Sequence, residues 1–123
     1  MTEIIIIRHG ETEWNKTGRF QGHSDVPLSE EGRAQAEALG RNLVLDHADA
    51  IYASDLTRAI ETATPLAKRF GLTVMPDPLL RELNFGAWEG RNFQDVNAES
   101  PDAMKRFYSD PERVDIPNSE PFP

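Results

Sequence analysis

The sequence predicts an α/β fold with a mostly parallel sheet, and three features indicate it. The apolar run of residues 4–7 does not alternate with polar residues, which is typical of a strand buried on both faces. Residues 50–53 and 73–75 form two further short runs with strand character. Stretches with helical spacing of apolar residues lie between them, and strands that alternate with helices indicate a parallel sheet.

The residues at their ends help to predict the two helices between these runs. Ser29 can cap a helix that continues to about residue 45, because its hydroxyl can accept a hydrogen bond from the first turn. A second helix is expected over residues 55–70. Pro65 should kink or restart this helix, and Gly71 suits its C-terminal stop.

The composition changes after Gly90, where prolines replace glycines. The pair Ser100-Pro101 predicts one more helix, which continues to about Tyr108. The prolines of residues 111–123 then predict an extended tail that does not end on a packed element.

Length and charge restrict the class of protein. The 123 residues are enough for one modest domain, and the absence of cysteine excludes a disulfide framework and a thiolate nucleophile. A formal net charge of −8 argues against a nucleic-acid binder, although a few arginines can still form a local phosphate site. The N-terminal apolar run is too short for a membrane span or a signal peptide, so a cytoplasmic protein is expected.

The segment Arg8-His9-Gly10 follows the first predicted strand and opens a long loop over residues 8–28. Ligands bind at the carboxyl edge of open α/β sheets, and loops of this length are usually functional. A guanidinium at Arg8 suits an anionic substrate, and neutral imidazole at His9 is a nucleophile near pH 7. These residues predict a histidine that attacks phosphorus; the alternative is a loop histidine that is hydrogen-bonded for structure.

Four blocks of the sequence follow one another along the chain: Arg8-His9-Gly10-Glu11-Thr12 with Gly18-Arg19-Phe20-Gln21-Gly22, then Asp25-Val26-Pro27-Leu28-Ser29, Ser54-Asp55-Leu56-Thr57-Arg58-Ala59, and Leu80-Arg81-Glu82-Leu83-Asn84-Phe85-Gly86-Ala87-Trp88-Glu89-Gly90. Four ordered blocks are far more specific than one short motif. In this order and spacing they resemble the histidine phosphatase superfamily, which includes cofactor-dependent phosphoglycerate mutases and many phosphatases of small molecules. The resemblance covers nearly the whole chain.

The resemblance implies a three-layer α/β/α fold with a mostly parallel sheet. Family members continue for many tens of residues beyond this point, through a strand that carries a second histidine in a His-Gly motif. We therefore expect residues 1–123 to be a single histidine-phosphatase-like domain that is incomplete at its C-terminus. In the family fold the further strand lies between those that match residues 3–7 and 50–53, so its absence would leave strand edges unpaired.

The resemblance also implies roles for individual residues. His9 is the expected nucleophile, and Arg8 and Arg58 are expected to hold the phosphate; a surface arginine at a helix start is the alternative for Arg58. Glu82 is the candidate proton donor to the leaving oxygen, a role that needs an apolar setting favouring the protonated carboxyl. The alternative for Glu82 is an ion pair with Arg81.

Three further residues match family positions near the phosphate or substrate: Asn15, Gln21 and Gly22. Ordinary turn chemistry is their alternative. Trp14 and Trp88 could flank a pocket, although packing is the more frequent role of tryptophan. His23 and His47 have no such context and are expected to be solvated.

The function that follows is a phosphomonoesterase that acts on a small phosphorylated metabolite through a phosphohistidine at His9. No metal or organic cofactor is expected, because arginines can supply the positive charge. Residues 83–90 resemble the short phosphatase form of their block, which favours a phosphatase. The alternatives are a phosphoglycerate mutase-like phosphotransferase and a catalytically impaired fragment of such an enzyme. The sequence leaves the particular phosphomonoester and the oligomeric state open.

Overall fold

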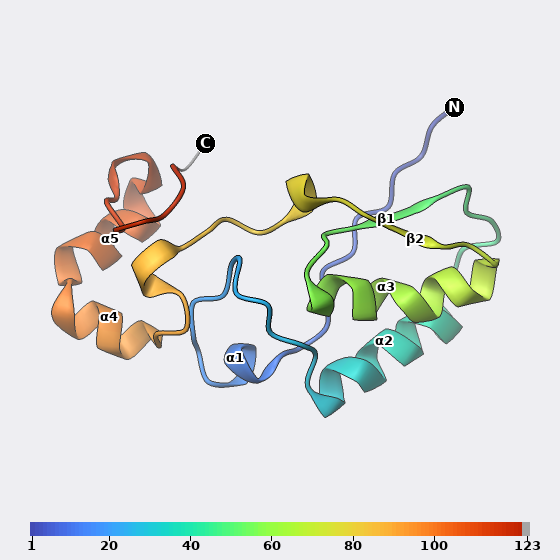
Figure 1. Ribbon diagram of the computed structural model, residues 1–123, viewed down its shortest axis with the longest axis horizontal. Helices are drawn as coiled ribbons and strands as arrows, with labels where there is room; N and C mark the ends of the chain where they lie inside the picture. Colours follow the sequence, from blue (N-terminus) through green and yellow to red (C-terminus); the bar gives the residue numbers. More distant parts are fainter. Residues whose placement is uncertain (122–123) are drawn as a thin grey trace.

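A computed structural model describes residues 1–121 of the chain (Figure 1). Its longer elements are two helices packed on a small sheet and a second pair of helices near the C-terminus. In chain order the elements are α1 (Glu13–Lys16), α2 (Glu30–Asn42), β1 (Ile51–Ala53), α3 (Thr57–Phe70), β2 (Val74–Pro76), α4 (Phe93–Glu99) and α5 (Pro101–Ser109), with 3₁₀ turns at Pro78–Leu80 (η1), Gly86–Trp88 (η2) and Pro111–Arg113 (η3).

The strands β1 and β2 pair in parallel, with Ile51 opposite Val74. Figure 1 shows α3 along one face of the two strands, with α2 packed on the outer side of α3. On the strands themselves, Tyr52 and Met75 are exposed. The predicted α/β order of strands and helices is therefore present. Among residues 1–121, the helices α2 and α3 form the helical layer on one face of this sheet.

The start of α2 and the end of α3 lie where their capping residues predict. The hydroxyl of Ser29 accepts the Gly32 N–H at 3.1 Å and so caps α2, although this helix stops at Asn42 rather than near residue 45. Gly71 terminates α3 in the left-handed conformation at φ 65°. A single helix continues through Pro65, so the predicted restart is wrong.

The helix pair meets closely at Pro65. A Cβ atom on Gly40 would lie 2.9 Å from Pro65 Cβ, so only glycine lets α2 approach α3 this closely. Replacing either residue would therefore alter the packing of both helices.

The N-terminal apolar run is the main departure from the prediction. Residues 3–7 form no strand, and Ile4 and Ile6 are 78% and 91% exposed. A buried strand needs neighbours for its backbone hydrogen bonds and cover for its side chains. In residues 1–121, β1 and β2 pair with each other, and no described strand pairs with residues 3–7.

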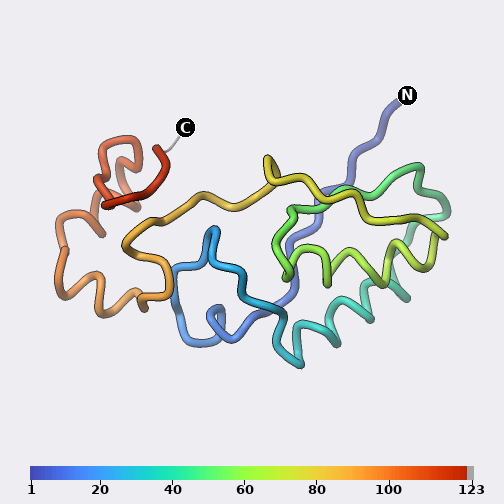
Figure 2. The backbone as a smooth tube through the Cα atoms, viewed as in Figure 1, coloured from blue at the N-terminus to red at the C-terminus, as the bar shows by residue number. Residues whose placement is uncertain are grey.

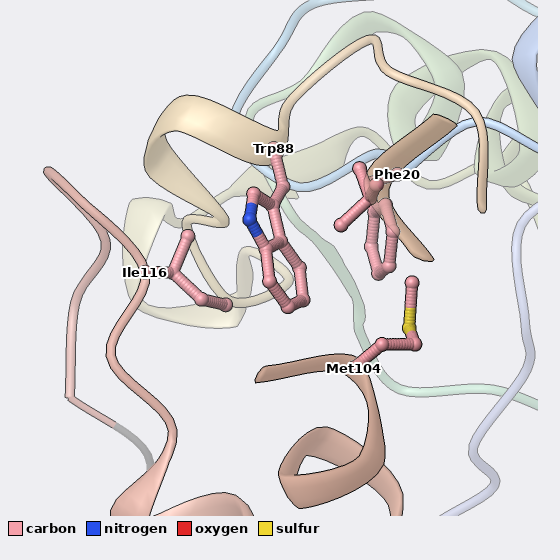
Figure 3. Close-up of a cluster of buried hydrophobic side chains, with 5 residues drawn as sticks. Phe20, Trp88, Met104 and Ile116 are labelled. Carbon is pink, nitrogen blue, oxygen red and sulfur yellow. The ribbon is translucent and has the colours of Figure 1, made fainter. Parts of the chain in front are cut away.

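A second core lies on the other side of the molecule. Figure 3 shows Phe20, Trp88, Met104 and Ile116 turned toward one another, and together with the fully buried Val96 they form a buried hydrophobic cluster. Trp88 therefore packs, as its commoner role predicts.

This core also corrects the prediction of an extended tail. Ile116 is only 3% exposed, because it reaches back to cover this core. The helix predicted from Ser100-Pro101 is confirmed as α5, but the helix α4 before it was not predicted. The last two residues of the predicted tail lie outside the described residues.

The chain between the two cores is extended. Figure 2 shows it leaving β2 (yellow) and crossing to the side of α4 and α5 (orange), above the light-blue loop that precedes α2. The two segments are joined by hydrogen bonds, including Gly22 N–H to the Glu89 carboxylate at 3.0 Å. Among the described residues, no helix has the length and apolar character needed to cross a membrane.

Candidate active site

His9 follows the N-terminal run and is tied to α3 through its neighbour Gly10. The Gly10 N–H donates to the hydroxyl of Thr62 at 2.9 Å, and that hydroxyl donates to the Arg58 carbonyl at 2.7 Å. Thr62 is buried, so these hydrogen bonds are protected from water. The segment of His9 and Gly10 and the first turn of α3 are therefore held in one position relative to each other.

The ring of His9 contacts the backbone through one nitrogen. Its Nδ1 lies 2.6 Å from the Gly10 carbonyl oxygen. A carbonyl only accepts hydrogen bonds, so Nδ1 carries a proton, and in the neutral ring the lone pair is then on Nε2. This geometry matches the tautomer that a nucleophilic histidine needs.

The surroundings of His9 favour the neutral ring. Burial lowers the pKa of His9, and the positive charges of Arg58 and Arg8 lower it further, while the contact with Gly10 and the charge of Glu82 act in the opposite direction. The charges of Arg8, Arg58 and Glu82 therefore all act on the ring of His9.

An NMR titration of His9 is expected to give a midpoint below the ordinary histidine value of about 6.5. The folded protein then binds fewer protons here than the unfolded chain. The contribution of His9 to stability is therefore complete above the unfolded pKa and is lost as pH falls through the lower folded pKa.

Arg8→Gln should move the midpoint of the His9 titration upward, because it removes a positive charge. Arg41→Gln, at an exposed arginine near the end of α2, should not. Equal midpoints in all three proteins would show that Arg8 does not act on the ring.

Arg58 lies in the first turn of α3 and is only 2% exposed. Its guanidinium donates Nη1–H to the Ser24 carbonyl at 2.7 Å and Nη2–H to the Gly22 carbonyl. Burial lowers the pKa of Arg58, against the opposing charges of Glu89, Glu82 and Asp25. The alternative of a solvated surface arginine is therefore wrong.

Glu82 is placed near the site but not in the expected setting. Its side chain is exposed, and its carboxylate accepts the Leu83 N–H at 2.8 Å. An apolar setting would bury this carboxyl, but Leu80 beside it is 53% exposed and Trp88 packs into the second core. An ion pair between Glu82 and Arg81 is also wrong, since Arg81 forms a bidentate pair with Asp55 at 2.6 and 2.7 Å.

Asn15 and Gln21 meet at Thr12, which is fully buried. The Asn15 side-chain oxygen accepts the Thr12 N–H at 2.9 Å, and the Gln21 side-chain oxygen lies 2.7 Å from the Thr12 hydroxyl. Both amide oxygens are used within the protein, so what each side chain can offer an anion is its amide N–H₂ group.

Gly22 has its backbone groups engaged inside the protein. Its N–H donates to Glu89 and its carbonyl accepts from Arg58. A Cβ atom at this position would overlap the Leu83 carbonyl oxygen, so the glycine permits a close approach of two backbones. Gly22 therefore shapes this turn in the free protein, and its expected contact with the phosphate stays a prediction.

Sequence reasoning did not single out Thr62, Ser24 or Glu89. Thr62 could have been found, because it lies four residues after Arg58 and so on the same face of a helix. Ser24 and Glu89 are 65 residues apart in the chain, and nothing local indicates their hydrogen bond.

Comparison with known proteins shows the family of this chain. The family model of the histidine phosphatase superfamily (branch 1) matches residues 4–123. The chain belongs to this superfamily. Superfamily membership makes it part of an enzyme family in which a phosphohistidine mechanism is general.

Individual relatives carry both phosphatase and mutase names. Phosphoserine phosphatase 1 of Hydrogenobacter thermophilus is 36% identical over 120 residues, which are 98% of this chain and 57% of the relative. Phosphoglycerate mutase-like protein 4 of Arabidopsis thaliana is 42% identical over 120 residues, covering 94% of this chain and 51% of the relative. The chain thus spans about half the length of the curated relatives it matches.

A solved structure shows the same arrangement of elements. A mycobacterial glucosyl-3-phosphoglycerate phosphatase, solved with VO₃, superposes with a TM-score of 0.78 at 36% identity and covers 92% of this chain and 56% of its own. The fold is therefore phosphoglycerate mutase-like, and this chain matches a little over half of that structure.

Proposed function

We propose that this chain carries the phosphoryl-accepting site of a phosphomonoesterase, with His9 as the nucleophile. The observation that supports this most directly is the state of the ring. Nδ1 donates to the Gly10 carbonyl, which leaves the Nε2 lone pair available, and the neighbouring arginines favour the neutral form. An imidazole nucleophile requires both conditions.

In the proposed first step, His9 Nε2 forms a bond to phosphorus as the bond from phosphorus to the ester oxygen breaks. Glu82, when protonated, donates its proton to that leaving oxygen. Water then attacks phosphorus and gives a proton to the Glu82 carboxylate, the bond between nitrogen and phosphorus breaks, and inorganic phosphate leaves. In the free protein Glu82 bonds to Leu83 N–H, so it has to leave this hydrogen bond to act.

Arg8 and Arg58 would stabilise the negative charge of the transferring phosphoryl group. The amide N–H₂ groups of Asn15 and Gln21 are candidate donors to the same group, since their oxygens are turned toward Thr12. These side chains can provide positive charge and hydrogen bonds without a cofactor. The named relatives act on different phosphates, so the proposed substrate is the class of small phosphomonoesters.

The test is hydrolysis of an aryl phosphate by the purified chain, with acid-labile phosphohistidine located by mass spectrometry. His9→Ala should lower phosphate release by at least about 10³-fold, because it removes the nucleophile. His47→Ala is the matched control, since this histidine is exposed and pairs with Asp49. Equal activity of the chain and its His9→Ala variant, or folded protein that forms no phosphohistidine, would contradict the proposal.

A mutase-like phosphotransferase is the second candidate, favoured by the name of the Arabidopsis relative. Incubation with 2,3-bisphosphoglycerate separates the two functions. Transfer of phosphate from the phosphorylated protein to monophosphoglycerate would support the mutase. Release of inorganic phosphate alone would support the phosphatase.

A further inference from the structure

The turn at residues 22–24 lies between a carboxylate and a guanidinium. Its N–H groups at Gly22 and Ser24 donate to Glu89 at 3.0 and 2.9 Å. Its carbonyls at the same two residues accept from Arg58. The turn is therefore held from both sides by opposite charges.

Glu89 is anchored by more than the turn. The Ser24 hydroxyl donates to Glu89 Oε1 at 2.6 Å, and the Phe85 N–H donates to Oε2 at 2.9 Å. Burial alone would raise the pKa of Glu89, but the hydrogen bonds from Ser24, Phe85 and Gly22 outweigh it and lower the pKa. Glu89 is thus a carboxylate anion, and a neutral side chain would accept the same hydrogen bonds more weakly.

The other side of the turn fixes Arg58. Two of its N–H groups donate to the turn, and its charge acts on the ring of His9. A guanidinium has five N–H groups, so it can bind the turn and an anion together. The position of the turn therefore decides where the positive charge lies relative to the nucleophile.

We propose that Glu89 is a positioning residue for phosphate binding: it orients the 22–24 turn so that the turn's carbonyls hold Arg58 beside His9. The proposal rests on the proposed function, because it concerns the same phosphate site. Glu89 itself need not touch the substrate. The negative charge of Glu89 also partly balances the positive charge of the buried Arg58 when no anion is bound.

Glu89→Gln tests this. The glutamine keeps the size of the side chain but removes its charge, and its N–H₂ group must face either the donors of the turn or the Phe85 N–H, so the hold of this side chain on the turn should weaken. Inorganic phosphate, titrated by NMR, should bind about tenfold more weakly than to the unchanged chain. The pKa of His9 should rise toward its ordinary value, because Arg58 moves away from the ring. A side chain that only stabilised the fold would not shift this titration in a folded variant.

Glu99→Gln is the matched control. Glu99 is an exposed glutamate at the end of α4 that pairs with Arg91 at 2.6 Å. The same chemical change there should alter neither phosphate binding nor the titration of His9. Circular dichroism of each variant would confirm that it is folded.

Ser24→Ala provides a second, milder test if Glu89→Gln does not fold. It removes the hydroxyl bond to Glu89 and leaves both backbone bonds. Smaller shifts in the same directions are expected. A folded Glu89→Gln variant with unchanged phosphate affinity and an unchanged His9 titration would overturn the inference, as would an unaffected Ser24→Ala if that were the only folded variant.

The two proposals fail in different ways. If the protein without substitutions bound no phosphate and formed no phosphohistidine, this result would contradict the proposed function. The titration of His9 in the variants would still show whether Glu89 positions Arg58, because that measurement needs no bound ligand.

Discussion

Arg58→Met is expected to abolish phosphate binding and to destabilise the protein. Methionine has a similar length but no donor, so the carbonyls of Gly22 and Ser24 lose charged hydrogen bonds in a buried setting. We expect the free energy of unfolding to fall by about 2–4 kcal/mol. The affinity for inorganic phosphate should fall at least about 100-fold, since the buried cation of the proposed phosphate site is lost.

Urea unfolding and an NMR titration with phosphate would measure the two effects. Arg69→Met is the matched control, because Arg69 also donates to backbone carbonyls, at 2.7 Å to Leu43 and 2.6 Å to Leu45, but is exposed near the far end of α3. This control should lose some stability and keep its phosphate affinity. An Arg58→Met variant that bound phosphate as well as the Arg69→Met variant would remove Arg58 from the site.

The sequence could predict the helices because their signals are local. A cap such as Ser29 and a left-handed terminator such as Gly71 act within one helical turn, whatever lies elsewhere in the chain. The 3₁₀ turns and α4 were missed because short elements have few periodic positions. For α4, the Asn92 cap was the available signal, with its side-chain oxygen 2.7 Å from the Asp95 N–H.

The strand predicted at residues 3–7 does not form, because an apolar run does not by itself decide whether a strand forms. An apolar run only indicates that burial would be favourable, whereas strand formation depends on a partner for the backbone and cover for the side chains. The paired strands β1 and β2 have each other, and the N-terminal run has no described strand beside it. Its isoleucines are exposed for this reason rather than because their pattern was misread.

The candidate site also has a part that the sequence predicts and a part that it does not. The types of residue that suit phosphate chemistry, His9 and Arg58, could be named from motifs and order. Their support could not, because Glu89 reaches its partners across 65 to 67 residues. Glu82 shows the converse: its motif predicts a role, but the apolar surroundings that the role needs depend on packing that a motif does not specify.

Gly32→Ala is expected to destabilise the protein by about 1–3 kcal/mol, although glycine to alanine in a helix usually stabilises. Gly32 lies in the first turn of α2, and a Cβ atom there would overlap the Glu11 carbonyl oxygen. The neighbouring backbone cannot yield freely, because the Glu11 carbonyl also accepts the Ser29 N–H at 2.8 Å. The substitution should therefore push α2 away from the turn that carries His9.

Thermal unfolding and the NMR signal of His9 would test this together. Gly71→Ala is the control, since its Cβ would meet nothing within 4 Å and its cost arises only from the left-handed backbone, about 1 kcal/mol. The control should lower stability and leave the His9 signal unchanged, whereas Gly32→Ala should alter both. A Gly32→Ala variant more stable than the unchanged chain would mean that α2 does not press on residues 10–11, and that α2 does not help to position His9.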